Sequence, residues 1–597
     1  MPPIFDKLTQ ALKKKRPWYE LATVLAIPHL IRIRNDMRKK NLYDTEEPPL
    51  AKRPENEPIP PEHKDTRSID GTYNDTGCPF MGAAVRRLGR NVPLEETRPD
   101  IANLLNPSPR EVSRALMTRT EFQPAPILNL FAAAWIQFMV HDWFVHKNSD
   151  GRTIDVPLQD GDPWPANPMR IKATEPDAAP EGSTRPPAYI NLNSHWWDAS
   201  QVYGSDTETA KKLRTFEDGK LKLTESGRLF LDPDSGIEIT GFTDNGWIGL
   251  IILHTLFARE HNAICDMLKA SNPGKDDQWL YMKARLINAA ILAKIHTVEW
   301  TTAILPHPTT QLALRTNWQG IAGEDLQEVF SFLDDSELLG GILGSTAEHH
   351  AAPYSLTEEF ASVYRMHALM PDEIVIRSRQ SGEELSRYTL PEVLGRKGCE
   401  VLDKHTFPDM IYSFGVSHPG AIRLHNYPKH LQDLTTDKGE HLDLATIDIL
   451  RDRERGVPRY NRFRRLLGKE PVTSFEELTD NPTWREELRQ LYAGDLEKVD
   501  LMVGLYAEPL PKGFGFSETA FRIFILMASR RLKSDRFFTD DFRPEIYTNE
   551  GIEWIKANGF ASILKRHYPE VAAGLKGVKN PFAPWKTASA KIKATKA

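Results

Sequence analysis

Long apolar stretches with helical spacing dominate the chain. Residues 126–145 are apolar almost all round, which is typical of a helix buried on every side. Residues 246–267 and 279–305 are long and helix-like, and residues 517–531 begin with a serine, a preferred N-cap residue. Alternating apolar and polar positions, which indicate half-buried strands, are scarce. The pattern therefore predicts a mainly α protein.

The N-terminal segment, residues 1–43, differs from this helical body. Lysines and arginines flank its apolar run over residues 18–33, and charged residues and a proline interrupt it. The run is too short and too interrupted to span a bilayer. Two interpretations stay open: the segment is a basic amphipathic element at a membrane interface, or it packs on the body through Leu21, Leu25 and Leu30.

The other boundaries follow shifts in composition. Residues 44–66 are rich in proline and glutamate and indicate an extended linker, and residues 162–188 indicate a surface loop. Residues 67–585 are expected to form the main domain, and the basic residues 586–597 a flexible tail. No internal repeat and no secretory signal peptide is visible.

Composition narrows the function classes. Hydrophobic residues make up 40% and charged residues 26% of the 597 positions, which excludes a disordered or many-spanning membrane protein. The formal net charge of −6 gives no reason to expect nucleic acid as a partner. Cys78, Cys265 and Cys399 are far apart, so neither a disulfide framework nor a zinc ribbon is expected. We expect an intracellular protein, cytoplasmic or peripherally membrane-associated, with no transmembrane span.

The first candidate for chemistry is His141, in the predicted buried helix. Gln137 lies one helical turn before it and shares its face. A histidine in so apolar a helix is costly to bury unless it has a partner. Taken alone, a core histidine with a satisfied hydrogen bond is the simpler interpretation. No HExxH motif is present, so the sequence does not support a zincin.

The second candidate is a short segment that could bind a metal. Four of its residues lie two positions apart, so that an extended loop would direct them to one side: Ser194, Trp196, Asp198 and Ser200. Hydroxyl, backbone carbonyl and carboxylate oxygens suit calcium, which is a hard cation. The alternative is an ordinary turn with no ligand.

The third candidate is the pair Tyr364 and His367. On a helix, residues three apart are neighbours, with about 5–6 Å between their Cβ atoms. A histidine can ligate iron, and a tyrosine one turn away can exchange an electron with that cofactor. The alternative is a tyrosine that only hydrogen-bonds its neighbours. An iron-ligating histidine donates its other ring nitrogen to a partner, for which Asn426 is a candidate.

Taken together in chain order, these segments resemble the animal-type haem peroxidase and cyclooxygenase superfamily. The resemblance covers roughly residues 70–570 and includes a helix segment that ends in Arg-Glu-His-Asn at residues 259–262. It implies a haem-dependent peroxidase (cyclooxygenase-like) fold, with a single large helical domain around haem b. It also implies that Asp142 completes the calcium site and that Tyr364 is the radical tyrosine of the oxygenase branch.

The resemblance also assigns the residues expected around the haem. His141 would be the distal histidine, with Gln137 in the same motif, and His367 would be the proximal iron ligand. Arg451 and Arg455 resemble the arginines near the haem propionates.

Within that branch, the chain is similar to the fatty-acid α-dioxygenases. The family's histidine, threonine and arginine that bind the substrate carboxylate correspond to His296, Thr301 and Arg531. Arg530 is the neighbouring alternative to Arg531. A spacing of five does not place His296 and Thr301 on one face of a regular helix. Their convergence therefore rests on the resemblance or on a local helix irregularity.

The resemblance implies a defined reaction. Peroxide would activate the haem, with His141 accepting a proton. Tyr364 would become a radical that takes a hydrogen atom from the α-carbon of a long-chain fatty acid. O2, the co-substrate, would add to give a 2-hydroperoxy fatty acid, which can lose CO2 and leave an aldehyde one carbon shorter.

Two positions depart from the peroxidase pattern. A peroxidase would carry its distal arginine near Thr243 and its haem-linking glutamate near Gly246, and neither residue type is present there. The sequence therefore does not favour efficient peroxide reduction. Two alternatives to the α-dioxygenase stay open. One is a mid-chain fatty-acid oxygenase or haem peroxidase of the same superfamily, and the other is a non-catalytic membrane-surface protein that keeps the scaffold.

Overall fold

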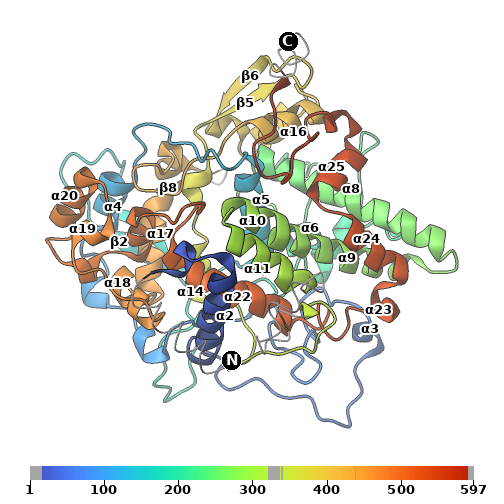
Figure 1. The fold of residues 1–597 in the computed structure, drawn as a ribbon, viewed down its shortest axis with the longest axis horizontal. Helices are drawn as coiled ribbons and strands as arrows, with labels where there is room; N and C mark the ends of the chain where they lie inside the picture. The colour runs from blue at the N-terminus through green and yellow to red at the C-terminus, as the bar shows by residue number, and fades with distance from the viewer. Residues whose placement is uncertain (1–15, 321–336, 338–339, 437–438, 589–597) are drawn as a thin grey trace.

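The computed structural model describes residues 16–320, 337, 340–436 and 439–588, and most of the regular secondary structure in this part is helical (Figure 1). Its strands form four two-stranded antiparallel sheets: β1 (Arg86–Arg87) with β4 (Ile190–Asn191), β2 (Asn148–Val156) with β3 (Met169–Thr174), β5 (Glu373–Arg377) with β6 (Glu384–Thr389), and β7 (Leu434–Thr435) with β8 (His441–Leu442). The prediction of a mainly α protein is confirmed.

The α-helices surround one extended apolar core. They are α2 (Thr23–Lys40), α3 (Pro61–Lys64), α4 (Pro109–Val112), α5 (Phe131–Trp143), α6 (Ser200–Tyr203), α7 (Thr207–Leu213), α8 (Ile248–Ser271), α9 (Asp277–Lys294), α10 (Thr301–Ile304), α11 (Pro308–Gln319), α14 (Glu358–Val363), α15 (Gly395–Val401), α16 (Phe407–Val416), α17 (Leu444–Glu454), α18 (Tyr460–Leu466), α19 (Phe475–Leu478), α20 (Pro482–Leu491), α21 (Leu501–Ala507), α22 (Glu518–Ser534), α23 (Pro544–Tyr547), α24 (Asn549–Ala557) and α25 (Phe560–His567).

Helix α5 lies near the centre of the molecule (Figure 1) and packs against α6 and α8. It is the helix predicted over residues 126–145, and nearly all of its side chains are buried. It ends where Phe144 adopts an extended conformation, with φ −149° and ψ 135°. This burial places the polar residues of its last turn inside the molecule, where each needs a partner.

The long helix predicted over residues 279–305 is interrupted. It consists of α9, a π-helical turn η5 (Ile295–Trp300) and α10. Asp276 caps the start of α9 by accepting a hydrogen bond from the backbone of Trp279. A π-turn contains one more residue than an α-turn, and such turns are frequent at functional sites.

The N-terminal segment packs on the helical body from residue 16 onward. Trp18 is buried, and its indole nitrogen donates to Glu518 Oε1 at 3.0 Å. Helix α2 contacts α11 and α22, and Arg38 forms two hydrogen bonds with the carboxylate of Glu337 at 2.8 and 2.9 Å. Within the described ranges, no helix is both long and apolar enough to cross a bilayer. Contact of this segment with a membrane surface stays a prediction.

The prediction of a surface loop over residues 162–188 is wrong in its middle part, where β3 pairs with β2. The short alternation at Met169 and Ile171 buries both side chains beside Leu450, and this packing selects the strand. The three cysteines are buried and form no disulfide bond. Most of the basic tail predicted over residues 586–597 lies outside the described residues.

Two buried histidines on α8 make stability depend on pH. His254 Nδ1 lies 2.8 Å from Thr240 Oγ1, and His261 lies 2.9 Å from both the Tyr203 hydroxyl and the Gly219 carbonyl. Burial lowers the pKa of His254 to about 3 and that of His261 to about 4. Between pH 6.5 and 4, both histidines are therefore protonated in the unfolded protein and neutral in the folded protein.

We expect the free energy of unfolding to fall as the pH drops through this window, by up to about 1.4 kcal/mol per pH unit for each histidine. Thermal unfolding at pH 7.5, 6 and 5 measures the slope. His254→Gln and His261→Gln should each make it shallower. Equal slopes in all three proteins would contradict the assignment.

Candidate active site

The last two turns of α5 present Gln137 and His141 to the segment that follows residue 241. The Gln137 amide donates to the Asn245 carbonyl at 3.0 Å and accepts from the Trp247 indole at 2.9 Å. The His141 ring lies 4.4 Å from the Phe242 ring, and its Nδ1 has no hydrogen-bond partner among the described residues. Burial lowers the pKa of His141 to about 3, so the neutral imidazole can accept a proton.

Tyr364 and His367 do not share a helix, so the helical spacing considered for the pair does not apply. Helix α14 ends at Val363, because Tyr364 leaves helical geometry with φ −89° and ψ 4°. His367 begins the 3₁₀ turn η6 (His367–Leu369). The Tyr364 ring points into the core, whereas the His367 side chain is 38% exposed. The turn between them gives each side chain its own environment.

The hydrogen-bond partner of His367 is Asp448 on α17. Its carboxylate oxygen Oδ2 lies 2.8 Å from His367 Nδ1 and accepts from the Tyr427 hydroxyl at 3.0 Å. Burial disfavours the charged imidazolium, but the Asp448 carboxylate outweighs this and raises the pKa of His367. The arrangement fixes the ring and leaves Nε2 to bind a metal.

The expectation of Asn426 as that partner is wrong. Its side-chain amide donates to the Gln123 and Ala421 carbonyls and accepts from Arg119, so it holds backbone segments together. Sequence reasoning missed Asp448 because 81 residues separate it from His367 and no motif marks it.

The π-turn η5 brings His296 and Thr301 together. The Thr301 hydroxyl donates to the His296 carbonyl at 2.7 Å, which is a five-residue contact that a regular helix does not make. The local irregularity that the spacing required is therefore present. His296 Nε2 lies 3.4 Å from the Tyr364 hydroxyl, and the His296 ring stacks on Trp300. Burial, with Arg531 nearby, keeps the pKa of His296 well below 6.5, so the ring is neutral.

Arg531 on α22 is 1% exposed and lies among aromatic rings. Its guanidinium carbon is 3.9 Å from the centre of a Trp197 ring and 4.4 Å from that of Trp143. Arg531 forms no ion pair with a carboxylate in the described part of the protein, although Asp142 is near enough for the two charges to interact, and Nε and Nη2 of Arg531 have no hydrogen-bond partner there. A buried guanidinium without an ion-pair partner is unfavourable, so an anion that binds beside it would stabilise the charge.

Arg530 differs from its neighbour in every contact. Its guanidinium donates to four backbone carbonyls, those of His349, Ala352, Pro353 and Ser355. These hydrogen bonds to the protein backbone engage all three nitrogens of the Arg530 guanidinium. Of the two arginines, only Arg531 has donors available to a ligand.

Tyr364, His296 and Arg531 converge around Trp143. The Trp143 ring centre lies 5.0 Å from that of Tyr364 and 5.0 Å from that of His296. Burial raises the pKa of Tyr364, although Arg531 opposes this, so the phenol keeps its proton. The structure thus places a neutral phenol, a neutral imidazole and a guanidinium together, and among the described residues no carboxylate forms an ion pair with the guanidinium.

An apolar cavity of about 70 Å³ adjoins this cluster. It lies between α2, α11 and α22, and Thr301 and Phe524 line it. The Phe524 ring stacks on Tyr364 with 4.4 Å between ring centres, so the cavity leads away from the phenol. Its walls are mostly aliphatic and aromatic, which suits a hydrocarbon tail.

Arg451 and Arg455 face β3. Arg451 pairs with Glu454 at 2.6 Å, and Arg455 donates to the Thr174 hydroxyl at 3.1 Å. A different arginine, Arg365, lies near the His367 partner: its guanidinium is 3.6 Å from the Asp448 carboxylate. Contact of Arg451 and Arg455 with a cofactor stays a prediction.

The predicted calcium loop folds against the end of α5. Ser200 donates its backbone N–H to Asp142 Oδ1 at 2.6 Å, and the Ser194 hydroxyl donates to Asp198 Oδ2 at 2.5 Å. Asp142 Oδ2 and the Ser200 hydroxyl are buried and have no partner among the described residues. Burial raises the pKa of Asp142 to about 7. Unpaired buried oxygens of this kind fit a hard cation.

Trp196 lies in the same loop, with its indole stacked on Tyr354, so only its backbone carbonyl is left to serve a cation. Among the described residues, no three His, Cys, Asp or Glu side chains form a metal-binding group. A cation there would therefore depend on two carboxylates, two hydroxyls and a carbonyl.

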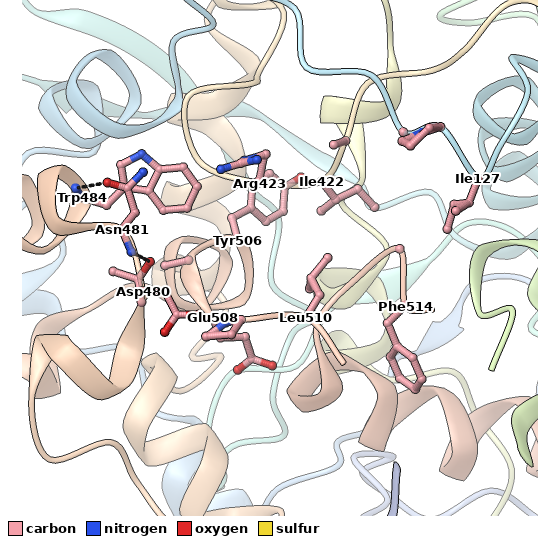
Figure 2. A pocket seen from close by; sticks show the side chains of 17 residues that line it. Ile127, Ile422, Arg423, Asp480, Asn481, Trp484, Tyr506, Glu508, Leu510 and Phe514 are labelled. Carbon is pink, nitrogen blue, oxygen red and sulfur yellow. Dashed lines mark hydrogen bonds between the residues drawn. The ribbon is translucent and has the colours of Figure 1, made fainter. Parts of the chain in front are cut away.

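A second, more open cavity of about 380 Å³ lies apart from this cluster, and none of the predicted site residues lines it (Figure 2). Arg423 covers the Trp484 ring at one end, at 4.8 Å. Tyr506 connects this wall with the turn that carries the candidate site, since its hydroxyl donates to the Arg365 carbonyl at 2.8 Å.

Comparison with known proteins decides the family. The sequence profile described as Animal haem peroxidase matches residues 66–579. The chain belongs to this family. Alpha-dioxygenase PIOX of Oryza sativa subsp. japonica is 37% identical over 97% of this chain and 96% of its own length. Alpha-dioxygenase 1 of Arabidopsis thaliana is 37% identical over 97% and 92%. Within the animal haem peroxidases, the chain therefore belongs with the alpha-dioxygenases.

Solved structures agree with this placement. The fatty acid alpha-dioxygenase of Arabidopsis thaliana matches with a TM-score of 0.89 and 36% identity over 98% of this chain and 92% of that one. A tyrosine-to-phenylalanine variant of the Oryza sativa enzyme, crystallised with palmitic acid, matches with a TM-score of 0.89 and 37% identity over 98% and 97%. Peroxidase A of Dictyostelium discoideum, at 19% identity and a TM-score of 0.68, shares the fold.

Membership of the animal haem peroxidases implies haem, and the residues present fit it. His367 has one ring nitrogen fixed by Asp448, while the side chain is partly exposed on the other side. His141 is buried with an unpartnered ring nitrogen among the residues described. These are the features that an iron ligand and a neutral proton acceptor require.

Proposed function

We propose that this animal haem peroxidase is a fatty-acid alpha-dioxygenase, which converts a fatty acid and O2 into a 2-hydroperoxy fatty acid. The observation that carries the proposal is the buried Arg531 guanidinium, which lacks a carboxylate partner within the described residues and lies beside Tyr364 and His296. A fatty-acid carboxylate supplies the missing charge and places its α-carbon near the phenol. The names of the relatives at 37% identity support the same reaction.

The carboxylate anchor consists of Arg531 and His296, and Thr301 supports it by donating its hydroxyl to the His296 carbonyl. The guanidinium offers a planar pair of donors, which matches the two oxygens of a carboxylate. The neutral His296 adds a donor without adding charge. Because the anchor fixes one end of the substrate, the carbon next to the carboxylate is the one held at Tyr364.

The acyl tail occupies the apolar cavity between α2, α11 and α22. The lining includes Ile27 and Leu30 on α2 and Leu532 on α22. Burial of each methylene group contributes about 0.8 kcal/mol, which favours long fatty acids. The N-terminal segment is therefore part of the substrate site.

The chemistry depends on Tyr364 acting as a hydrogen-atom carrier. Haem, when bound by His367 and activated by peroxide, supplies the one-electron oxidation. The Tyr364 oxygen then takes a hydrogen atom from the α-carbon, O2 bonds to the resulting carbon radical, and the peroxyl group takes a hydrogen atom back from the phenol. The net change is insertion of O2 into one C–H bond, and the tyrosyl radical is regenerated.

His141 and Gln137 would contribute to the same cofactor site. The neutral His141 would accept a proton from peroxide, and Gln137 positions the segment from Asn245 to Trp247 through its two hydrogen bonds. Arg451 and Arg455 supply positive charge for the haem propionates.

Product analysis tests the function. The holoenzyme incubated with palmitate and O2 should give 2-hydroperoxypalmitate and its decarboxylation product, pentadecanal. A saturated fatty acid has no activated C–H bond in its middle, so a hydroperoxide away from the α-carbon would identify a mid-chain oxygenase. Peroxide consumption without oxygen uptake would identify a peroxidase.

Calcium bound by Asp142, Ser194, Trp196, Asp198 and Ser200 acts as a structural clamp between α5 and the loop. Chelation of the holoprotein should lower Tm, since a ligand at 100 times its Kd contributes about 2.7 kcal/mol to the free energy of unfolding. Calcium, but not magnesium, should restore Tm, because Mg²⁺ demands a smaller octahedral site. Ser200→Ala should weaken the response, whereas Ser205→Ala, just outside the loop, should not. If chelation leaves Tm unchanged, the assignment of a calcium site is wrong.

A further inference from the structure

Arg531 differs from the ion-paired buried arginines of this protein in what surrounds its charge. Arg67 lies between Asp198 and Asp535 at 3.1 and 2.9 Å, and Arg453 pairs with Asp500 at 2.7 Å. Acidic partners are the usual solution for a buried guanidinium. Around Arg531, aromatic rings make the direct contacts, the closest being Trp197 and Trp143, and the nearby Asp142 acts on it through charge alone.

The two indoles form a corner around the guanidinium. Their ring centres are 5.5 Å apart, with planes at 85° to each other. The same rings lie 5.0 Å (Trp143) and 5.7 Å (Trp197) from the His296 ring. Both indole nitrogens are buried and have no acceptor among the described residues, as is the case for His296 Nδ1 and for Nε and Nη2 of Arg531. The corner therefore presents several N–H groups without acceptors among the described residues, which is an environment that suits an anion.

Aromatic faces and acidic side chains have different consequences for an incoming carboxylate. An aspartate or glutamate would occupy the N–H donors of the guanidinium and repel the substrate charge. The negative face of an indole attracts the cation and uses none of its N–H groups. The guanidinium stays charged, fixed in place and open to a ligand.

We infer that Trp197 and Trp143 are positioning residues for the substrate carboxylate: their ring faces hold the Arg531 guanidinium in place of an acidic partner, so that its donors stay free for the fatty acid. The inference rests on the proposed function. The segments that carry the rings are joined, because Trp143 follows Asp142 and the backbone N–H of Ser200, three residues after Trp197, donates to that carboxylate. The corner is thus a fixed part of the fold.

Trp197 is the residue to test, since Trp143 also contacts Tyr364. Palmitate binding to the holoenzyme is measured without O2, and kcat and KM are measured with it. Trp197→Leu should raise Kd and KM about tenfold and change kcat little, and Trp197→Phe should recover part of the loss because a phenyl face still attracts a cation. Trp135→Phe is the control, as this tryptophan of α5 is fully buried and its ring contacts phenylalanines such as Phe582, and the Kd of the variant should match that of the wild type.

A double-mutant comparison separates positioning from general support of the fold. In the Arg531→Ala background, Trp197→Leu should raise Kd no further, because the ring acts through the guanidinium. An equal increase in both backgrounds, or an unchanged Kd in Trp197→Leu alone, would overturn the inference. Tight palmitate binding by the wild type without 2-hydroperoxide would refute the proposed function and leave the positioning role standing.

Discussion

Tyr364→Phe should abolish oxygen uptake with palmitate, with a loss of roughly a thousandfold or more, while haem remains bound. The variant removes only the hydroxyl that carries the hydrogen atom. The phenyl ring keeps the contacts with Trp143 and Phe524, at 5.0 and 4.4 Å between ring centres, so the site should keep its shape. Oxygen-electrode assays measure the loss, and the Soret absorbance reports the bound haem.

Tyr547→Phe is the matched control for this change. Its hydroxyl is also buried and donates to the Phe537 carbonyl at 2.8 Å, far from His296. This variant should lose some stability and keep its oxygen uptake. Normal turnover by Tyr364→Phe would rule out the phenol as the hydrogen-atom carrier and would require another radical site.

Arg531→Ala should raise the KM for fatty acids about 10- to 100-fold, because hydrogen bonds to charged groups contribute about 1.5–3 kcal/mol each. The loss should also scatter the position of oxygenation, since the carboxylate no longer fixes which carbon reaches Tyr364. Steady-state kinetics gives the KM, and mass spectrometry of the hydroperoxides gives their positions.

Arg530→Ala provides the contrast within the same helix. Its guanidinium is bonded to backbone carbonyls, including those of Ala352 and Pro353 at 2.8 Å, so the variant should have a lower Tm and an unchanged regiochemistry. An unchanged KM and product in Arg531→Ala, with a raised KM in Arg530→Ala, would exchange the roles of the two arginines.

Both arginines lie in an apolar helix that the sequence predicts, yet the sequence did not separate them. Adjacent residues point about 100° apart on a helix, and both faces of this one are apolar. Only the packing of α22 decides that Arg530 meets the carbonyls of residues 349–355 and that Arg531 meets Trp197. The same holds for Asp448, which a different helix brings to His367.

Sequence patterns predicted the structure correctly where neighbouring residues along the chain determine it. The apolar run of α5, the serine cap of α22 and the five-residue spacing of His296 and Thr301 each left a mark in the sequence. The spacing required a break in helical geometry, and η5 provides it. Surface strands such as β3 were missed because their short alternation gains stability only from a distant partner, here Leu450 on α17.

The sequence by itself determined the helical class, the order of the motifs and the kinds of side chain that could perform radical chemistry. Hydrophobic periodicity and residue type are properties of neighbours along the polypeptide, so they can be read without coordinates. The tertiary structure alone decided which carboxylate orients His367, which arginine forms no ion pair among the described residues and which rings surround it. Those outcomes depend on contacts between segments hundreds of residues apart, whose free energies arise only when the core has packed.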